Sequence, residues 1–385
     1  MDNAKSHPAR YLAPSIRSDL ERRMVFIGGP RQVGKTTMAL GLLGRGVDES
    51  HPAYFNWDSA EDRKKLLGGQ LPPGERVLIL DEIHKYSRWR NFLKGLYDKQ
   101  KSHYRFLVTG SARLDYYRRG GDSLLGRYHY LRLHPLSLRE VDPECHAKTV
   151  QTLLAFGGFP EPFFAANPGL HRRWLRERHQ RVLQEDLRDL EHVKEITLLE
   201  ELLGHLPACV GSPLSLPSLK NLLGVAHETV DRWVGIFDRL YLCFRIPPFG
   251  SKRIRAVRKE QKLYFWDWST IPDPGPRFEN LVASQLLKYC HWVEDTEGHG
   301  MELRYLRDTD KREVDFVVVR DGRPEFAVEC KTGERSVSAS AAYFKERLPI
   351  PAFYQVHLGT QDFVHASTGI RVLPFQTFCR ERELP

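Results

Sequence analysis

Short apolar runs alternate with helical patterns over the first third of the chain. Met24–Ile27, Val77–Leu80 and Tyr104–Val108 are short and apolar, as strands buried on both faces of a parallel sheet should be. The alternation of such strands with helices predicts an α/β domain built on a parallel sheet. It ends near Leu133–Ser137, where the sequence becomes richer in polar residues and proline.

The part that follows is mostly helical in pattern. Arg172–Leu190 is long, charged and free of Gly and Pro, and Leu216–Gly224 is followed at once by His227–Leu240. The second pair reads as a helix, a glycine-containing turn and a helix, which is the layout of a helix-turn-helix. Lys220 and Arg232 are the side chains that would meet phosphates, but no side chain identifies a base. A plain packing module is the alternative.

The last part of the chain returns to strand patterns. We predict a strand at Leu263–Trp266, a helix at Phe278–Leu287, and strands at Glu302–Leu306, Glu313–Val319 and Glu325–Cys330. Asp321-Gly322, between the last two strands, is a hairpin turn signal. The chain is therefore expected to have three domains, at residues 1–140, 141–260 and 261–385, because 385 residues are too many for one hydrophobic core.

Composition adds little to this division. Hydrophobic residues make up 41% and charged residues 28% of the chain, as in ordinary globular proteins. No apolar run approaches the roughly 20 residues of a membrane span. The first residues lack the apolar core of a signal peptide. We therefore expect a cytoplasmic protein without a membrane partner, whose six singly spaced cysteines are reduced and mostly buried.

The net charge of +9, with a pI near 9.2, leaves two interpretations open. Lysine and arginine release counterions from phosphates, so a basic protein of this size is a candidate for contact with DNA or RNA. The alternative is a generally cationic surface without such a partner.

A phosphate-binding loop follows the first strand. Its residues are Gly29, Pro30, Arg31, Gln32, Val33, Gly34, Lys35, Thr36 and Thr37. Gly34 lets backbone N–H groups approach phosphate oxygens, Lys35 supplies a cation to the β and γ phosphates, and Thr36 offers a hydroxyl to Mg²⁺ at the positive end of a helix. The loop predicts binding of a nucleoside triphosphate, ATP with Mg²⁺.

The second strand ends in two carboxylates that suit the same chemistry. Asp81 is placed to hold Mg²⁺, directly or through water, and Glu82 to orient or deprotonate an attacking water. An apolar strand that ends in Asp-Glu is common by itself. Downstream of a phosphate loop it favours hydrolysis over binding alone.

Further polar residues lie beyond the third strand. Ser111 and Arg113 are candidates for contact with the γ-phosphate or the attacking water, with an ordinary polar loop as the alternative. Arg127 offers a cation for transition-state charge, either within the chain or from a neighbouring subunit.

These motifs together resemble a known family. They occur in the order Gly28–Thr37, Leu80–His84, Thr109–Ser111, Leu124–Arg127, Leu136-Ser137, Gly157–Glu161, Tyr264–Asp267 and Phe278–Asn280. The chain is similar over nearly its whole length to the prokaryotic AAA+ ATPases that carry a C-terminal DUF4143 domain.

The resemblance implies roles for several residues. Lys35 and Thr36 take Walker A roles, and Asp81 and Glu82 take Walker B roles. Ser111 falls at the sensor position. Arg127 matches an arginine near the edge between subunits, which implies a homo-oligomer. The resemblance also implies a winged-helix module in the middle region.

The C-terminal part carries a second set of candidate residues. Glu279 lies on the predicted helix, Asp315 on one strand, and Glu329 and Lys331 end the next. PD-(D/E)xK nucleases use carboxylates and a lysine in this order, with Mg²⁺ held at a phosphodiester. The family is similar to that fold. A structural salt bridge between Glu329 and Lys331 is the alternative.

Three interpretations of function stay open. The first is an ATPase switch or motor whose C-terminal domain recognises nucleic acid or a protein. The second is an ATP-gated, Mg²⁺-dependent nuclease. The third is a nucleotide-binding scaffold with negligible turnover.

Overall fold

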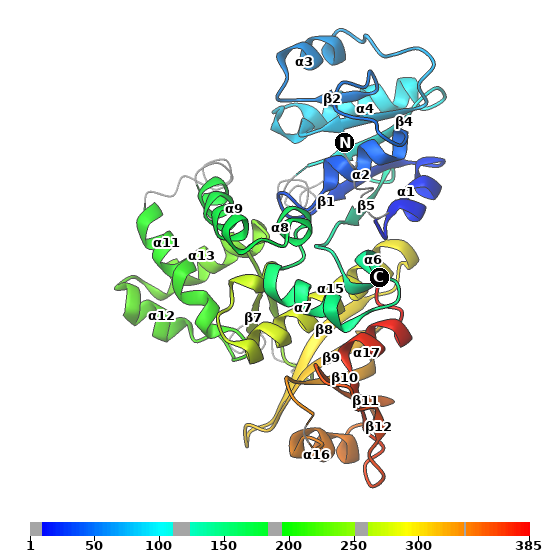
Figure 1. Cartoon of the computed structure of the whole chain (residues 1–385). Coiled ribbons are helices and arrows are strands. Elements are labelled where there is room, and N and C mark those ends of the chain that lie inside the picture. Colours follow the sequence, from blue (N-terminus) through cyan, green and yellow to red (C-terminus); the bar gives the residue numbers. More distant parts are fainter. Residues whose placement is uncertain (1–9, 111–123, 184–194, 251–260, 335) are drawn as a thin grey trace. The chain divides into compact units, whose positions relative to one another are not determined.

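The computed structural model describes residues 10–110, 124–183, 195–250, 261–334 and 336–385 (Figure 1). The chain forms two compact units, Met1–His134 and Pro135–Pro385. Each is described by itself. No helix within the described residues is both long and apolar enough to cross a membrane.

The first unit is a five-stranded parallel sheet with the strand order β2-β3-β4-β1-β5. Its strands are β1 (Met24–Gly28), β2 (Tyr54–Asn56), β3 (Val77–Asp81), β4 (Arg105–Thr109) and β5 (Tyr128–Arg132). Its helices are α1 (Ala13–Leu20), α2 (Lys35–Leu43), α3 (Ala60–Leu67), η1 (Ile83–Lys85) and α4 (Trp89–Gln100). The α/β fold and the three predicted strands are confirmed, and these three form the centre of the sheet. The edge strands β2 and β5 were not predicted, because one is three residues long and the other mixes polar with aromatic residues.

The register of this sheet brings three strand ends together. Ile27 of β1 and Asp81 of β3 both pair with Thr109 of β4. Because parallel strands point the same way, the loop after β1 and the carboxylates at the end of β3 lie at one edge. This edge, at the carboxyl ends of the strands, is where open α/β sheets bind ligands.

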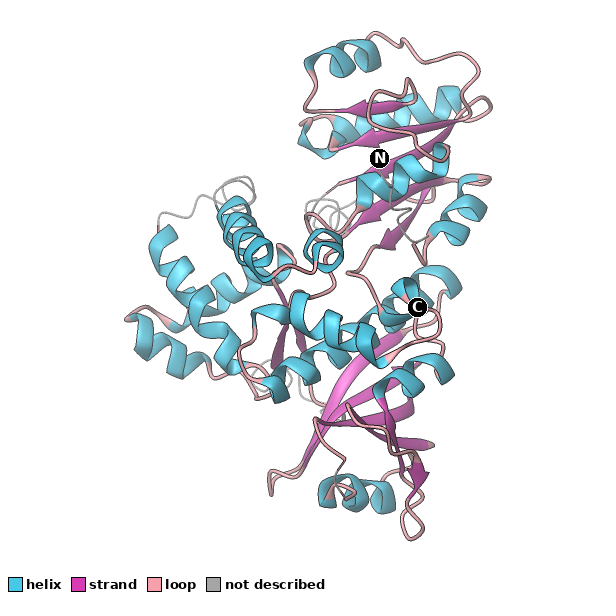
Figure 2. Cartoon of the chain, viewed as in Figure 1, coloured by secondary structure: helices cyan, strands magenta, loops and turns pink. Residues whose placement is uncertain are grey.

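The second unit begins with helices and a small strand pair (Figure 2). The helices are α6 (Leu138–Val141), α7 (Ala147–Phe156), α8 (Pro160–Ala165), α9 (Pro168–Arg181), α11 (Ile196–His205), η3 (Leu206–Cys209), α12 (Leu216–Leu223) and α13 (His227–Arg239). β6 (Cys243–Ile246) pairs antiparallel with β7 (Lys262–Phe265). The predicted helix pair is confirmed as α12 and α13. Gly224 between them has φ 66°, a left-handed conformation that ends α12.

A six-stranded mixed sheet with the order β12-β13-β11-β10-β9-β8 forms the rest of the unit. Its strands are β8 (Met301–Arg307), β9 (Glu313–Arg320), β10 (Arg323–Lys331), β11 (Ala352–His357), β12 (Phe363–Val364) and β13 (Arg371–Pro374). Its helices are η4 (Trp268–Thr270), α15 (Pro274–Glu297), α16 (Ala339–Arg347) and α17 (Phe375–Glu381). β9 and β10 form the predicted hairpin, with positive φ at both Asp321 and Gly322.

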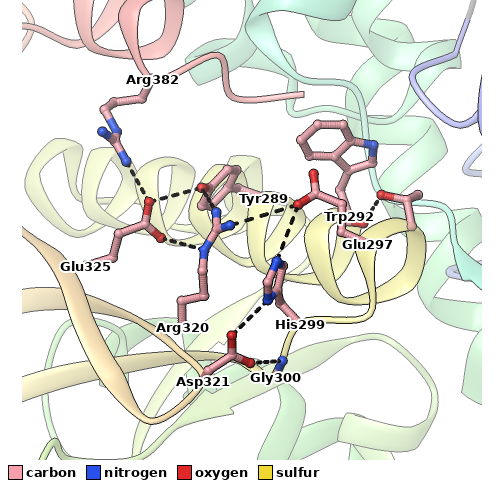
Figure 3. A network of polar contacts seen from close by, with 10 residues as sticks. Tyr289, Trp292, Glu297, His299, Gly300, Arg320, Asp321, Glu325 and Arg382 are labelled. Carbon is pink, nitrogen blue, oxygen red and sulfur yellow. Dashed lines mark hydrogen bonds and ion pairs between the residues drawn. The ribbon is translucent and has the colours of Figure 1, made fainter.

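A polar network fastens this hairpin to α15 and to the residue after α17 (Figure 3). Arg320 donates to the Tyr289 hydroxyl at 2.9 Å and approaches Glu325 at 3.4 Å. Arg382 reaches the same Glu325 at 3.0 Å. Asp321 at the turn pairs with His299 at 2.8 Å. The network holds β9 and β10 against the long helix.

One buried asparagine joins α15 to the small strand pair. The N–H of Phe265 donates to Asn280 Oδ1 at 2.7 Å, and Asn280 Nδ2 donates to the carbonyl of Phe265 at 2.7 Å. Asn280 is fully buried. It completes the backbone hydrogen bonding of a strand end that has no further strand beside it.

We therefore predict that Asn280→Ala destabilises the second unit by about 2–5 kcal/mol, because two buried backbone groups lose their partners. Urea unfolding measures the change. Asn221→Ala, on the exposed face of α12, is the matched control and should change stability by less than about 0.5 kcal/mol. Equal effects of the two substitutions would contradict the role given to Asn280.

Candidate functional site

The loop between β1 and α2 has a backbone that glycine alone adopts without strain at two positions. Gly29 has φ 146°, and a Cβ added there would lie 2.3 Å from the carbonyl oxygen of Leu133. Gly34 has φ 95° and caps the N-terminus of α2. The helix therefore starts with N–H groups facing the loop, which is an arrangement suited to an anion.

Lys35 folds back over this loop. Its ammonium donates to the carbonyls of Gly29 at 3.0 Å and Pro30 at 2.8 Å, and the side chain is almost fully buried. The loop thus holds a cation beside the N-terminus of α2. A phosphate bound there would meet that ammonium directly.

Asp81 accepts hydrogen bonds from three hydroxyl groups on three different elements. Thr109 at the end of β4 donates to Oδ1 at 2.6 Å, and Thr36 on α2 donates to Oδ2 at 2.8 Å. Tyr54 on β2 also donates to Oδ2, at 2.9 Å. Burial and the nearby Asp81 charge raise the pKa of Tyr54, so its hydroxyl keeps its proton. The carboxylate is held without any cationic side chain bonded to it.

Glu82 follows in a left-handed conformation, with φ 56°. This backbone turn directs the residue after β3 into the next element, and it is rarely adopted by residues other than glycine. Burial raises the pKa of the Glu82 carboxyl, while the charge of Lys35 opposes the shift. His84 and Lys85 lie 3.6 and 3.5 Å from its Oε2. A raised pKa is the direction that suits a general base.

Sequence reasoning missed Tyr54 and also Arg10. Arg10 is buried, and it donates to the carbonyls of Val33 in the loop, at 2.7 Å, and of His134 after β5. Neither residue has a local signal, because Tyr54 lies in a three-residue strand and Arg10 precedes the first helix. Only the strand register reveals what they contact.

Arg127 lies at the other edge of the sheet from the phosphate loop. The next residue, Tyr128, pairs with Met24 at the start of β1, whereas the loop follows the end of that strand. Arg127 makes a two-pronged ion pair with Asp98 on α4, at 3.0 and 3.1 Å. A role for Arg127 on nucleotide bound within its own chain does not fit this position. Action on a neighbouring subunit stays a prediction.

The predicted residues Ser111 and Arg113 lie outside the described residues.

The four nuclease-like residues of the C-terminal part are brought close together. Val328 pairs with Phe316 across the hairpin, which places Asp315 beside Glu329, and Cys330 N–H donates to Asp315 Oδ2 at 2.8 Å. Lys331 pairs with Glu329 at 2.6 Å, as the salt-bridge alternative predicted.

A lysine that was not predicted occupies the centre of this carboxylate cluster. Lys262 Nζ lies 3.2 Å from Glu279, 2.5 Å from Glu313 and 3.6 Å from Asp315. Burial disfavours its charge, but the three carboxylates raise the pKa of Lys262 above its ordinary value. Throughout the described residues, no group of three or more His, Cys, Asp or Glu side chains is placed to hold a metal ion.

Two carboxyl groups of the cluster are costly to ionise. Burial and the neighbouring Asp315 raise the pKa of Glu279 to about 7 and that of Glu329 to about 8. Glu329 Oε2 is buried and makes no hydrogen bond to a described residue.

The helix-turn-helix candidates Lys220 and Arg232 are exposed. Arg232 shares the exposed face of α13 with Glu228 and Asp231, so this face carries both charges. The β6–β7 pair follows α13 in chain order, as a wing would. DNA contact by this module stays a prediction.

Three family models match consecutive parts of the chain. An AAA domain matches residues 21–142, the domain of unknown function DUF8612 matches residues 147–271, and the domain of unknown function DUF4143 matches residues 274–378. The chain is 24% identical to an uncharacterized protein of Mycobacterium tuberculosis, over 94% of this chain and 83% of that protein. It is 23% identical to an uncharacterized protein of Methanocaldococcus jannaschii, over 82% of this chain and 77% of that protein.

Solved structures resemble the chain more distantly. RuvB of Thermotoga maritima matches with a TM-score of 0.31 and 17% identity, over 63% of this chain and 93% of that chain. The ORC1 protein of Aeropyrum pernix in complex with DNA matches with a TM-score of 0.32 and 16% identity, over 71% of this chain and 89% of that chain.

The raised pKa of Glu329 makes a prediction about stability. Since its pKa in the folded chain is about 8, its contribution to folding is fully present below about pH 4.5 and is lost as pH rises through about 8. One such group lowers the unfolding free energy by about 1.4 kcal/mol per pH unit in that range. Glu329→Gln should remove much of this slope in urea unfolding between about pH 5 and 8. The exposed Glu346→Gln, as control, should leave it unchanged.

Proposed function

Because the chain joins an AAA domain to a DUF4143 domain, we propose that it is an ATP-hydrolysing switch whose C-terminal unit engages a partner. The observation that carries this proposal is the Asp81 carboxylate. It lies 2.8 Å from the Thr36 hydroxyl, at the sheet edge where the phosphate loop begins. A loop for phosphate, a cation and a carboxylate–hydroxyl pair are the parts that nucleotide hydrolysis needs.

The residues at this edge fit ATP with Mg²⁺. The N–H groups at the start of α2 and the Lys35 ammonium bind the phosphates, for which Lys35 exchanges the carbonyls of Gly29 and Pro30. Thr36 and Asp81 present a hydroxyl and a carboxylate, the hard oxygen ligands that Mg²⁺ prefers, directly or through water. A bound Mg²⁺ supplies neutralisation of charge on the β and γ phosphates.

Glu82 acts on the attacking water in this proposal. Its carboxylate accepts the water's proton or orients the water in line with the γ-phosphate. Burial raises its proton affinity, which helps proton transfer at neutral pH. Thr109 and Tyr54 act through Asp81, by fixing the direction of its oxygens.

Nucleic acid is the partner that the charge favours. The exposed face of α9 carries Arg172, Arg173 and Arg176, with Arg181 near its end and Glu177 as the acidic residue among them. Clustered arginines release counterions from a phosphate backbone. The helix adds to the net charge of +9 of the whole chain. A protein partner is the alternative, and phosphate release that DNA and RNA leave unchanged would favour it.

The proposed ATPase is tested by two substitutions. Lys35→Ala should abolish binding of a fluorescent ATP analogue, because the loop loses its cation. Glu82→Gln should keep binding but slow phosphate release by about 10²-fold or more. Retained binding with lost turnover distinguishes a hydrolytic site from a scaffold. A wild-type protein that binds ATP but releases no phosphate, with or without nucleic acid, would contradict the proposal.

A homo-oligomer with Arg127 acting between subunits is tested by mixing. Arg127→Ala should lower turnover by roughly 10³-fold or more, since the transition state loses a cation. Mixed with Lys35→Ala subunits, it should regain activity, because each variant supplies what the other lacks. Asp98→Ala keeps Arg127 and serves as the control for loss of the ion pair. Mixtures that stay inactive although mixed oligomers form would argue against action between subunits.

A further inference from the structure

The carboxylate cluster of the C-terminal unit already contains a cation. Lys262, the first residue of β7, is fully buried. Its ammonium lies within 3.6 Å of carboxylates on α15 and β9. It also lies 5.5 Å from the centre of the Tyr305 ring, whose face attracts a cation. These contacts surround the ammonium with negative charge.

The lysine stem is fixed by backbone pairing. Lys262 pairs with Ile246 in the β6–β7 ladder and forms a bridge with Pro213 on its other side. The side chain therefore has no nearby exposed position to which it can swing without breaking this pairing. An ordered strand delivers the ammonium to the carboxylates.

The carboxylate oxygens have further partners besides this lysine. Glu279 Oε1 accepts from the Tyr264 hydroxyl at 2.7 Å. Glu279 Oε2 lies against Gly211, where an added Cβ would come within 3.0 Å of it. Asp315 Oδ2 accepts from the backbone of Cys330 at 2.8 Å. A metal ion bridging Glu279 and Asp315 would need to displace these partners.

A divalent cation does not fit this arrangement. Mg²⁺ binds carboxylate oxygens at about 2.0–2.1 Å in an octahedron of oxygens. Here the space between Glu279 and Asp315 is taken by an ammonium that cannot coordinate a metal and that repels one.

We infer that Lys262 permanently takes the place of a divalent metal in the nuclease-like cluster of Glu279, Glu313 and Asp315. The cluster serves as an internal fastening between β7, α15 and β9. Lys262 belongs to the region matched by DUF8612, and its carboxylates belong to the region matched by DUF4143. The ion cluster therefore joins these two regions within one unit. This inference does not depend on the proposed ATPase.

Metal binding by the nucleotide-free full chain tests the inference. Mn²⁺ is titrated and followed by electron paramagnetic resonance in wild type, Asp315→Asn and the exposed control Glu346→Gln. The three proteins should bind Mn²⁺ to the same extent. One additional Mn²⁺ per wild-type chain that is lost in Asp315→Asn and kept in Glu346→Gln would overturn the inference.

A second measurement tests the lysine itself. Lys262→Met leaves buried carboxylates without their cation and should lower the melting temperature by about 10 °C. Lys262→Met combined with Asp315→Asn removes one unpaired charge and should regain several degrees. A Lys262→Met protein as stable as wild type would overturn the inference, as would a double variant in which the two losses simply add. If Lys262→Met does not fold, the Mn²⁺ titration of wild type decides.

Discussion

A buried carboxylate needs hydrogen-bond donors or cations around it, and the candidate site of the first unit is organised by how Asp81 meets that need. Three hydroxyls converge on it from β2, α2 and β4. Each comes from a different crossover of the sheet, so the strand order β2-β3-β4-β1-β5 must form before the site exists. The fold and the site are therefore one arrangement seen at two scales.

The hydroxyl partners also suit a site that changes its occupant. A neutral hydroxyl bonded to a carboxylate exchanges for a metal or water at a small difference in free energy, because both states remain hydrogen-bonded or coordinated. Lys35 is held in the same way, by the carbonyls of Gly29 and Pro30. Neither group is committed to a salt bridge that ligand binding would have to break. The loop is pre-organised but exchangeable.

The sequence predicted the parts of both sites that depend on local pattern. The glycines of the loop, the apolar strand before Asp81 and the hairpin at Asp321 each have a short-range signal, and the structure contains each of them. Tyr54 and Lys262 were missed because their roles arise only when strands distant in sequence pair. The same holds for Arg127, whose distance from the loop follows from the register of β5 on β1 rather than from any motif.

The two units thus treat their acidic residues in opposite ways. In the first unit, hydroxyls bond Asp81, so a cation can arrive and leave. In the second, Lys262 is attached to the backbone among Glu279, Glu313 and Asp315, so the cation there does not exchange. A site that turns over needs exchangeable partners, whereas a fixed ion pair contributes to specificity of structure. The motif order of a nuclease is therefore not enough to assign nuclease chemistry, because one buried lysine from a neighbouring strand changes what the carboxylates can bind.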